Sequence, residues 1–199
     1  MDVKEERLQS EYETIKKWRS DVVSWKSIGD ADPPEHYEIF YNLKSIIGFD
    51  KAGEPIHHTG FKVLIKYDGD IPRVGPVIRF DIKTKPWPFH PNIWTDGVVC
   101  TEGTVNWLPG TGVPIDSICQ MVGEIIAFQE VNINSPANTD EQLTTWVEKN
   151  LVFENGAETK VRNPVDNSTV RLPDSDDVIT WGDEDDSSHS EKRIVFGDG

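Results

Sequence analysis

The chain has 199 residues and a formal net charge of −15, from 20 basic and 35 acidic side chains. Its length fits one domain with a tail, and its acidic balance argues against nucleic-acid binding, which requires clustered lysine and arginine. A basic protein partner is more plausible. Because no apolar run approaches a membrane span and no apolar signal core is present at the start, we expect a cytoplasmic protein that does not bind membranes.

An amphipathic helix is predicted from Glu5 to Trp25, ending before Gly29. Its apolar residues recur at spacings of three and four and are Leu8, Tyr12, Ile15, Trp18, Val22 and Trp25. Three stretches rich in Ile, Val, Phe and Tyr follow, separated by turn sequences, at 37–49, 60–67 and 76–82. Such spacing predicts antiparallel strands joined by turns.

Residues 83–112 have few periodic apolar positions and many Pro, Gly, Asn and Trp, which indicates a long, functional loop. His90-Pro91-Asn92 and Asp96-Gly97 are turn sequences, and Cys100 follows. The two turns bring an amide and a thiol to neighbouring loop tips. A sulfur nucleophile beside a hydrogen-bond donor is the minimum equipment for acyl transfer through a thioester.

Two helices are predicted in the second half of the chain. Pro114 fits a first helical position, and an apolar helical face runs from there to about Phe128. A short helix, capped within residues 139–141, should end near Asn150. Cys119 lies on the apolar side of the first of these helices, where packing is the favoured interpretation.

Cys100 and Cys119 are the only cysteines, so a disulfide framework is not expected. In a reducing compartment both thiols would stay free for chemistry or packing. His57, His58 and His90 have no zinc-site spacing with either cysteine, so we expect no metal.

Beyond residue 154 acidic side chains outnumber basic ones, and we expect a weakly ordered, solvated tail. An apolar island at Val178-Ile179-Thr180-Trp181 leaves open a docking peptide centred on Trp181. Removing the chain from residue 154 onward should leave the fold standing.

Taken in order, these pieces resemble the ubiquitin-conjugating (E2) family over about residues 5–150. The motifs that carry the resemblance are His90-Pro91-Asn92-Ile93 with Gly97 and Cys100, then Trp107-Leu108-Pro109, then Asn134-Ser135-Pro136-Ala137-Asn138. The resemblance implies an α+β, UBC-like fold with an N-terminal helix, an antiparallel four-stranded sheet, a long active-site loop and a central helix. It also implies a catalytic domain over 1–153, with the acidic tail over 154–199.

The resemblance implies a role for each candidate residue. Cys100 would receive a ubiquitin-like protein from an E1-type enzyme as a thioester and pass it to a target lysine; ATP is used by the E1, so no cofactor is expected here. Asn92 would support the loop and donate a hydrogen bond to the oxyanion. His90 would brace the loop, and Ser135 would orient the incoming amine.

Several segments depart from the family pattern. Ile71-Pro72-Arg73-Val74-Gly75-Pro76 has Arg73 where an aromatic residue is usual, and the loop at Gly110-Thr111-Gly112 is enlarged, so we expect an atypical ligase or none. A longer segment at Lys85-Pro86-Trp87-Pro88, and an acidic tail in place of C-terminal helices, resemble E2-like proteins of bacterial ubiquitin-like conjugation systems.

Two alternatives stay open from the sequence. One is a catalytically silent E2 variant that only binds ubiquitin-like proteins, against which the retained Cys100 and Asn92 speak. The other is a cysteine hydrolase with His90 as base, against which the lack of a second histidine and Asn or Asp at protease-like separation speaks.

Overall fold

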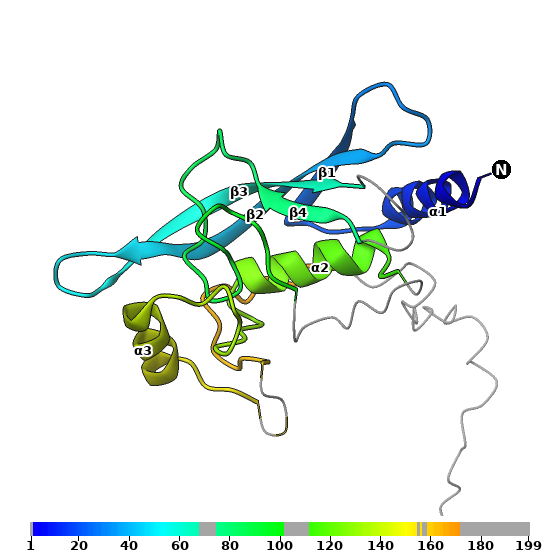
Figure 1. Cartoon of the computed structure of the whole chain (residues 1–199). Coiled ribbons are helices and arrows are strands. Elements are labelled where there is room, and N and C mark those ends of the chain that lie inside the picture. The colour runs from blue at the N-terminus through cyan, green and yellow to red at the C-terminus, as the bar shows by residue number, and fades with distance from the viewer. Residues whose placement is uncertain (1, 68–74, 102–111, 155, 157–158, 172–199) are drawn as a thin grey trace, which may run out of the picture.

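A computed structural model describes residues 2–67, 75–101, 112–154, 156 and 159–171. The elements are α1 (Val3–Lys17), β1 (Val23–Ile28), β2 (His36–Phe49), β3 (Pro55–Lys66), β4 (Val77–Phe80), α2 (Ile115–Ile126) and α3 (Glu141–Asn150), as Figure 1 shows. The strands form one antiparallel sheet in the order β1-β2-β3-β4. This arrangement confirms the predicted α+β class and its order of elements. In the described ranges no helix is long and apolar enough to cross a membrane.

The first helix ends earlier than predicted. The strand that the sequence did not locate, β1, begins within the segment that was predicted as helix. α1 ends at Lys17, and the hydroxyl of Ser20 then accepts hydrogen bonds from the backbone of Val22 at 3.2 Å and of Val23 at 3.1 Å. A serine side chain that bonds nearby backbone groups competes with a helix. The chain therefore turns into β1, which pairs with β2, although Trp25 keeps the helical spacing.

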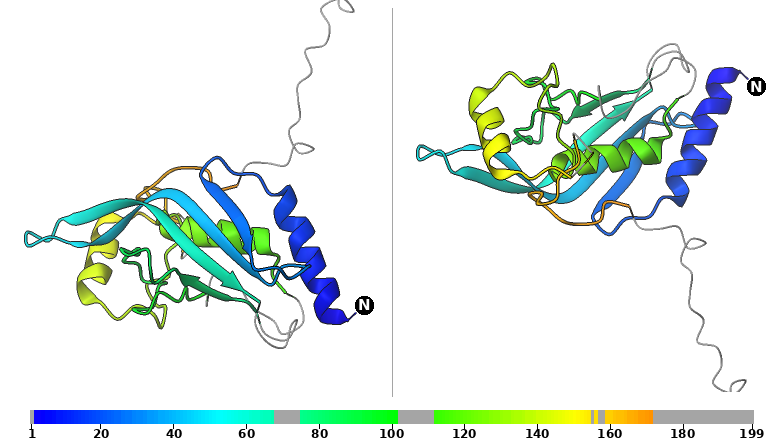
Figure 2. Two further views of the ribbon diagram at one scale, coloured as in Figure 1. Left: turned by 90° about the horizontal axis from the view of Figure 1, so that it is seen from above. Right: turned by 90° about the horizontal axis from the view of Figure 1, so that it is seen from below.

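The core lies between the sheet and α2. Tyr37, Ile39, Tyr41 and Leu43 alternate along β2 and are fully buried, as expected for one face of a strand. α2 lies along this face, with α1 across its first turn (Figure 2). The hydroxyl of Tyr41 donates to the carbonyl of Cys119 in α2 at 3.0 Å, which ties the helix to the sheet.

A carboxylate from α1 caps the start of α2. Glu11 is only 2% exposed, and its side chain accepts the Ile115 N–H at 2.6 Å and pairs with Arg7. Burial raises the pKa of Glu11, while these two contacts oppose the rise. The negative charge also suits the positive end of the helix dipole. Pro114 is the N-cap residue, so α2 begins at Ile115, one residue later than predicted.

α3 begins and ends as predicted. The side chain of Asp140 accepts the Leu143 N–H at 2.8 Å, and the helix ends at Asn150. The far end of the β2–β3 hairpin lies over α3 (Figure 1), where the rings of Phe49 and Trp146 are 6.2 Å apart. A second apolar cluster forms there from Ile46, Phe128, Val131, Leu143, Val147, Leu151 and Val161.

Residues 159–171, which we call the strap, differ from the weakly ordered tail that we expected from residue 154. Val161 and Val170 are 6% and 3% exposed, and Val170 belongs to the main core. Asp166 accepts the backbone N–H of Lys44 in β2 at 2.7 Å. Burial of these two valines stabilises the contact between the strap and the rest of the domain, so removing the strap should destabilise the domain. Trp181 lies outside the described residues, and the domain boundary at 153 stays a prediction.

We expect Gly123→Ala in α2 to destabilise the protein, although alanine normally favours a helix by about 1 kcal/mol. A Cβ atom at position 123 would lie 2.5 Å from Cγ1 of Val170 and 3.3 Å from the Tyr41 ring. Such overpacking costs ~1–3 kcal/mol. Urea unfolding of this variant and of Gly123→Ala/Val170→Ala, which should recover most of the loss, checks the expectation. A single variant more stable than the parent would contradict the packing of the strap on α2.

Candidate active site

Asn92 and Cys100 close a short hairpin, and this explains their spacing. The Cys100 N–H donates to the Asn92 carbonyl at 2.7 Å, and the Trp94 N–H donates to the Val98 carbonyl at 2.9 Å. Eight residues are thus enough for the chain to leave Asn92, turn and return beside it. The two turns therefore bring the backbones of Asn92 and Cys100 together.

The tip of this hairpin is fixed by side chains on both sides. The side chain of Asp96 accepts the Val98 N–H at 3.2 Å and forms an ion pair with Arg79 in β4. Gly97 has a φ of +88°, and a Cβ atom there would lie 3.1 Å from the ring of Trp87. The Trp87 ring therefore packs closely against the backbone at the tip of the hairpin.

The side chain of Asn92 points into the protein and is fully buried. Its Oδ1 accepts the backbone N–H of Asn132, after α2, at 2.9 Å. Its Nδ2 lies 3.5 Å from the carbonyl oxygen of Cys100, at the long limit for a hydrogen bond. One amide thus links the closing end of the hairpin to the turn that follows α2.

His90 lies beneath the hairpin as a neutral brace. It is 2% exposed, and its Nδ1 accepts the Asn92 N–H at 3.0 Å. Burial lowers the pKa of His90 to about 3, and a backbone hydrogen bond at Glu130 opposes this only in part. The imidazole is therefore neutral near pH 7, with one nitrogen already engaged in the loop. The ring also meets the Phe128 ring, with centroids 4.3 Å apart.

The remaining predicted residues have different environments. Ser135 is 4% exposed, and its hydroxyl accepts the Ala137 N–H at 3.3 Å, so it shapes its own turn; its role with an incoming amine stays a prediction. Cys100 is 7% exposed, whereas Cys119 is fully buried. Burial raises the pKa of the Cys119 thiol well above its usual range, which agrees with a packing role.

Other parts of the predicted site cannot be compared. Trp107-Leu108-Pro109, Arg73 and the first two residues of the enlarged glycine loop lie outside the described residues. Among the residues that are described, no group of three or more His, Cys, Asp or Glu side chains could hold a metal ion.

Two supporting residues were missed by sequence reasoning. Phe128 was assigned to the end of the central helix, but its φ of 56° is left-handed and places the ring against His90. Asn132 was not among the candidate residues, yet its backbone N–H donates to the side chain of Asn92. No motif could have identified either, because a backbone N–H is common to all residues except proline and a left-handed Phe has no sequence signature.

Together the fold and the site define an α+β protein with a slightly exposed cysteine at the base of a hairpin, an amide beside it and a neutral histidine below. No family model matches the chain. Over 93 residues it is 29% identical to Ubiquitin-conjugating enzyme E2 2 of Mycosarcoma maydis, covering 46% of each chain. Over 90 residues it is 30% identical to the protein of the same name from Candida glabrata, covering 45% of this chain and 49% of that one.

The matched region spans about half the length of each of these relatives. Solved structures of human Ubiquitin-conjugating enzyme E2 G1 and of UbcA1 from Agrocybe aegerita cover 60% and 64% of this chain, and 91% and 84% of theirs, at 24% and 17% identity. Their TM-scores are 0.43 and 0.46. The sequence similarity supports the resemblance to ubiquitin-conjugating enzymes, and the bacterial source stays a prediction.

We expect iodoacetamide at pH 8 to alkylate Cys100 in the native protein and to leave Cys119 unmodified. Cys119 is fully buried and its raised pKa leaves almost no thiolate, which is the reactive form. Peptide mass spectrometry measures both sites, and in urea both should react. Equal labelling of Cys119 in the native protein would contradict its buried position.

The buried His90 should make stability depend on pH. The pKa of His90 falls from 6.5 to about 3 on folding, so between these values only the unfolded chain binds the proton. Stability should therefore rise with pH across this window and be lost as pH falls, by ~5 kcal/mol at most. Urea unfolding between pH 4 and 7 should show a shallower slope for His90→Gln than for the parent, since all carboxylates are common to both. Equal slopes would refute a buried neutral His90.

Proposed function

We propose that this protein is an E2-type transferase for ubiquitin or a ubiquitin-like protein. The Cys100 thiolate attacks the thioester carbonyl of the protein carried by an E1-type enzyme, and the E1 thiolate leaves. The amine of a target lysine then attacks the Cys100 thioester, loses its proton to solvent and releases the Cys100 thiolate, which leaves an isopeptide bond. The placement of Asn92 beside Cys100 is the observation that carries this proposal.

The geometry of Asn92 suits an oxyanion donor. Its Oδ1 is held by the Asn132 N–H, so the donating Nδ2 is the end of the amide that faces Cys100. The contact of Nδ2 with the Cys100 carbonyl is long and therefore weak, so little is lost when Nδ2 turns to a developing oxyanion. His90 would hold the backbone of Asn92 during this step.

Partners follow from the chemistry. ATP is consumed by the E1-type enzyme, so this chain needs no cofactor. The acidic charge balance favours a target or ligase with a basic surface, and the departures around Arg73 favour an atypical ligase or none. We place the reaction in the cytoplasm, where thiols stay reduced.

A silent binding module is the second candidate, because Cys100 is only 7% exposed. A cysteine hydrolase is disfavoured, since the pKa of His90 is about 3 and its Nδ1 already accepts a hydrogen bond. The test incubates tagged parent protein and Cys100→Ala with ATP in a lysate of the source organism, followed by non-reducing gels with and without thiol reductant.

The proposal expects a heavier band that needs ATP and Cys100 and disappears with reductant. Mass spectrometry of this band then identifies the conjugated protein. If no band forms while E1 activity is demonstrably present in the lysate, the binding module replaces the transferase.

We expect Asn92→Ala to accept the thioester but to discharge it to lysine about 10²–10³-fold more slowly, the usual effect of losing one oxyanion donor. Single-turnover charging and chase with free lysine separate the two steps. Asn134→Ala, an exposed amide in the turn after α2, is the matched control and should discharge normally. An equal loss of both steps in Asn92→Ala would contradict the oxyanion role.

A further inference from the structure

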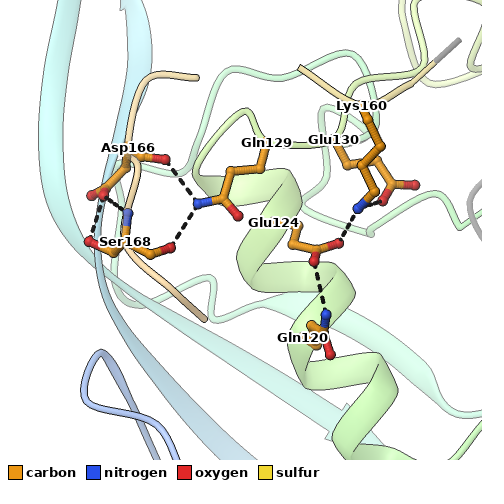
Figure 3. Close-up of polar contacts among 7 residues, drawn as sticks. All are labelled: Gln120, Glu124, Gln129, Glu130, Lys160, Asp166 and Ser168. Carbon is orange, nitrogen blue, oxygen red and sulfur yellow. Dashed lines mark hydrogen bonds and ion pairs between the residues drawn. The ribbon is translucent and has the colours of Figure 1, made fainter. Parts of the chain in front are cut away.

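We propose that the strap positions the active-site hairpin, with Lys160 as its main positioning residue; the effect on catalysis rests on the proposed function. The strap runs beside the end of α2, where Lys160, Asp166 and Ser168 meet side chains of the helix and the following turn (Figure 3).

The strap holds the turn after α2, residues 127–132, which we call the support turn, at several points. The hydrogen bonds are Val131 N–H to the Thr159 carbonyl at 2.8 Å, Val161 N–H to the Gln129 carbonyl at 3.0 Å, Asp166 N–H to the Ala127 carbonyl at 3.0 Å, and Gln129 Nε2 to the carbonyls of Asp166 at 3.0 Å and Ser168 at 2.8 Å. These bonds reach both ends of the support turn. Its conformation therefore depends on the strap.

Lys160 adds an ionic tie at the centre of this contact. Its Nζ lies 2.7 Å from Glu124 in α2 and 2.8 Å from Glu130 in the support turn, and Glu130 is 7% exposed (Figure 3). Gln120 also donates to Glu124 at 3.0 Å. Two carboxylates this close repel each other unless a cation lies between them, and an unpaired buried carboxylate is strongly unfavourable. Lys160 is thus required to keep Glu130 beside α2.

The support turn carries both supports of the hairpin. Phe128 has a left-handed φ of 56°, a conformation that persists in a bulky residue only when its surroundings fix it. Its ring packs on His90, and four residues later the Asn132 N–H binds Oδ1 of Asn92 at 2.9 Å. A shift of the support turn would therefore move both His90 and Asn92.

The strap lies beyond residues 5–150, which carry the resemblance to ubiquitin-conjugating enzymes. None of the strap residues that make these contacts belongs to a family motif. The strap is therefore a feature of this chain that lies outside the family motifs.

The first test measures backbone amide hydrogen exchange by NMR on the uncharged protein. In Lys160→Met, exchange of the Asn132 and Cys100 amides should rise about tenfold, because the support turn opens more often. Lys160→Arg, which keeps the cation, should restore protection. Lys26→Met is the matched control, because Lys26 is 67% exposed and pairs with Glu38 within the sheet. Amides in β2 and β3 should be unchanged, which shows that the fold is intact.

The second test uses charged protein. Lys160→Met should charge at the parent rate and discharge to free lysine about tenfold more slowly, and Lys160→Arg should recover the rate. If Lys160→Met fails to fold, Glu130→Gln replaces it. This variant removes the pair between Lys160 and Glu130 without leaving an unpaired carboxylate at position 130, and Lys160 keeps its pair with Glu124. It should raise Asn132 exchange by about threefold.

The outcomes separate the two proposals. Unchanged Asn132 exchange in a folded Lys160→Met protein overturns the positioning role, whether or not Cys100 carries a thioester. An equal fall in charging and discharge also overturns it. If exchange rises as expected but the parent protein never charges, the strap does position the hairpin and the proposed transferase function is what fails.

Discussion

The buried amide of Asn92 is the interaction on which the site depends. Its oxygen binds the turn after α2, its nitrogen lies beside the carbonyl of Cys100, and its backbone carbonyl accepts the Cys100 N–H. A fully buried amide must keep its hydrogen bonds, because leaving them unmade is unfavourable. The hairpin and the end of α2 are therefore held in one relative arrangement, and the position of the thiol follows from it.

α2 transmits this constraint because it is fixed at both ends. Glu11 from α1 binds its first turn, and Lys160 from the strap holds Glu124 near its last turn. In between, the helix packs on β2, with Tyr41 bonded to its backbone. Both ends rely on partly or fully buried charges with partners from distant parts of the sequence. Such contacts favour one packing of α2, as the proposed active-site loop at its end requires.

Local signals in the sequence predicted the parts that local chemistry determines. The Asp140 cap, the apolar face of α2 and the turns that bring Asn92 to Cys100 all follow from short-range patterns. β1 was predicted as helix because Trp25 continues a helical spacing, whereas its strand conformation comes from pairing with distant β2.

The strap shows a second limit of sequence reasoning. The acidic composition of residues 154–199 as a whole predicted a weakly ordered tail, but Val161 and Val170 of the strap occupy buried sites that only the folded domain provides. Phe128 and Asn132 were missed for a related reason, because one acts through its backbone conformation and the other through its N–H group. Motifs point to candidate site residues, while the groups that hold those residues in place depend on tertiary structure.

In the proposed mechanism, Asn92 stays bound to Asn132 while its side-chain nitrogen donates to the acyl group on residue 100. The most direct measurement is a crystal structure of the Cys100→Ser variant carrying its partner as a stable oxyester. We predict Asn92 Nδ2 within about 3 Å of the ester carbonyl oxygen, with Oδ1 still bound to the Asn132 N–H. An Asn92 side chain that has left Asn132, or whose nitrogen still points to the backbone carbonyl of residue 100, would contradict the account.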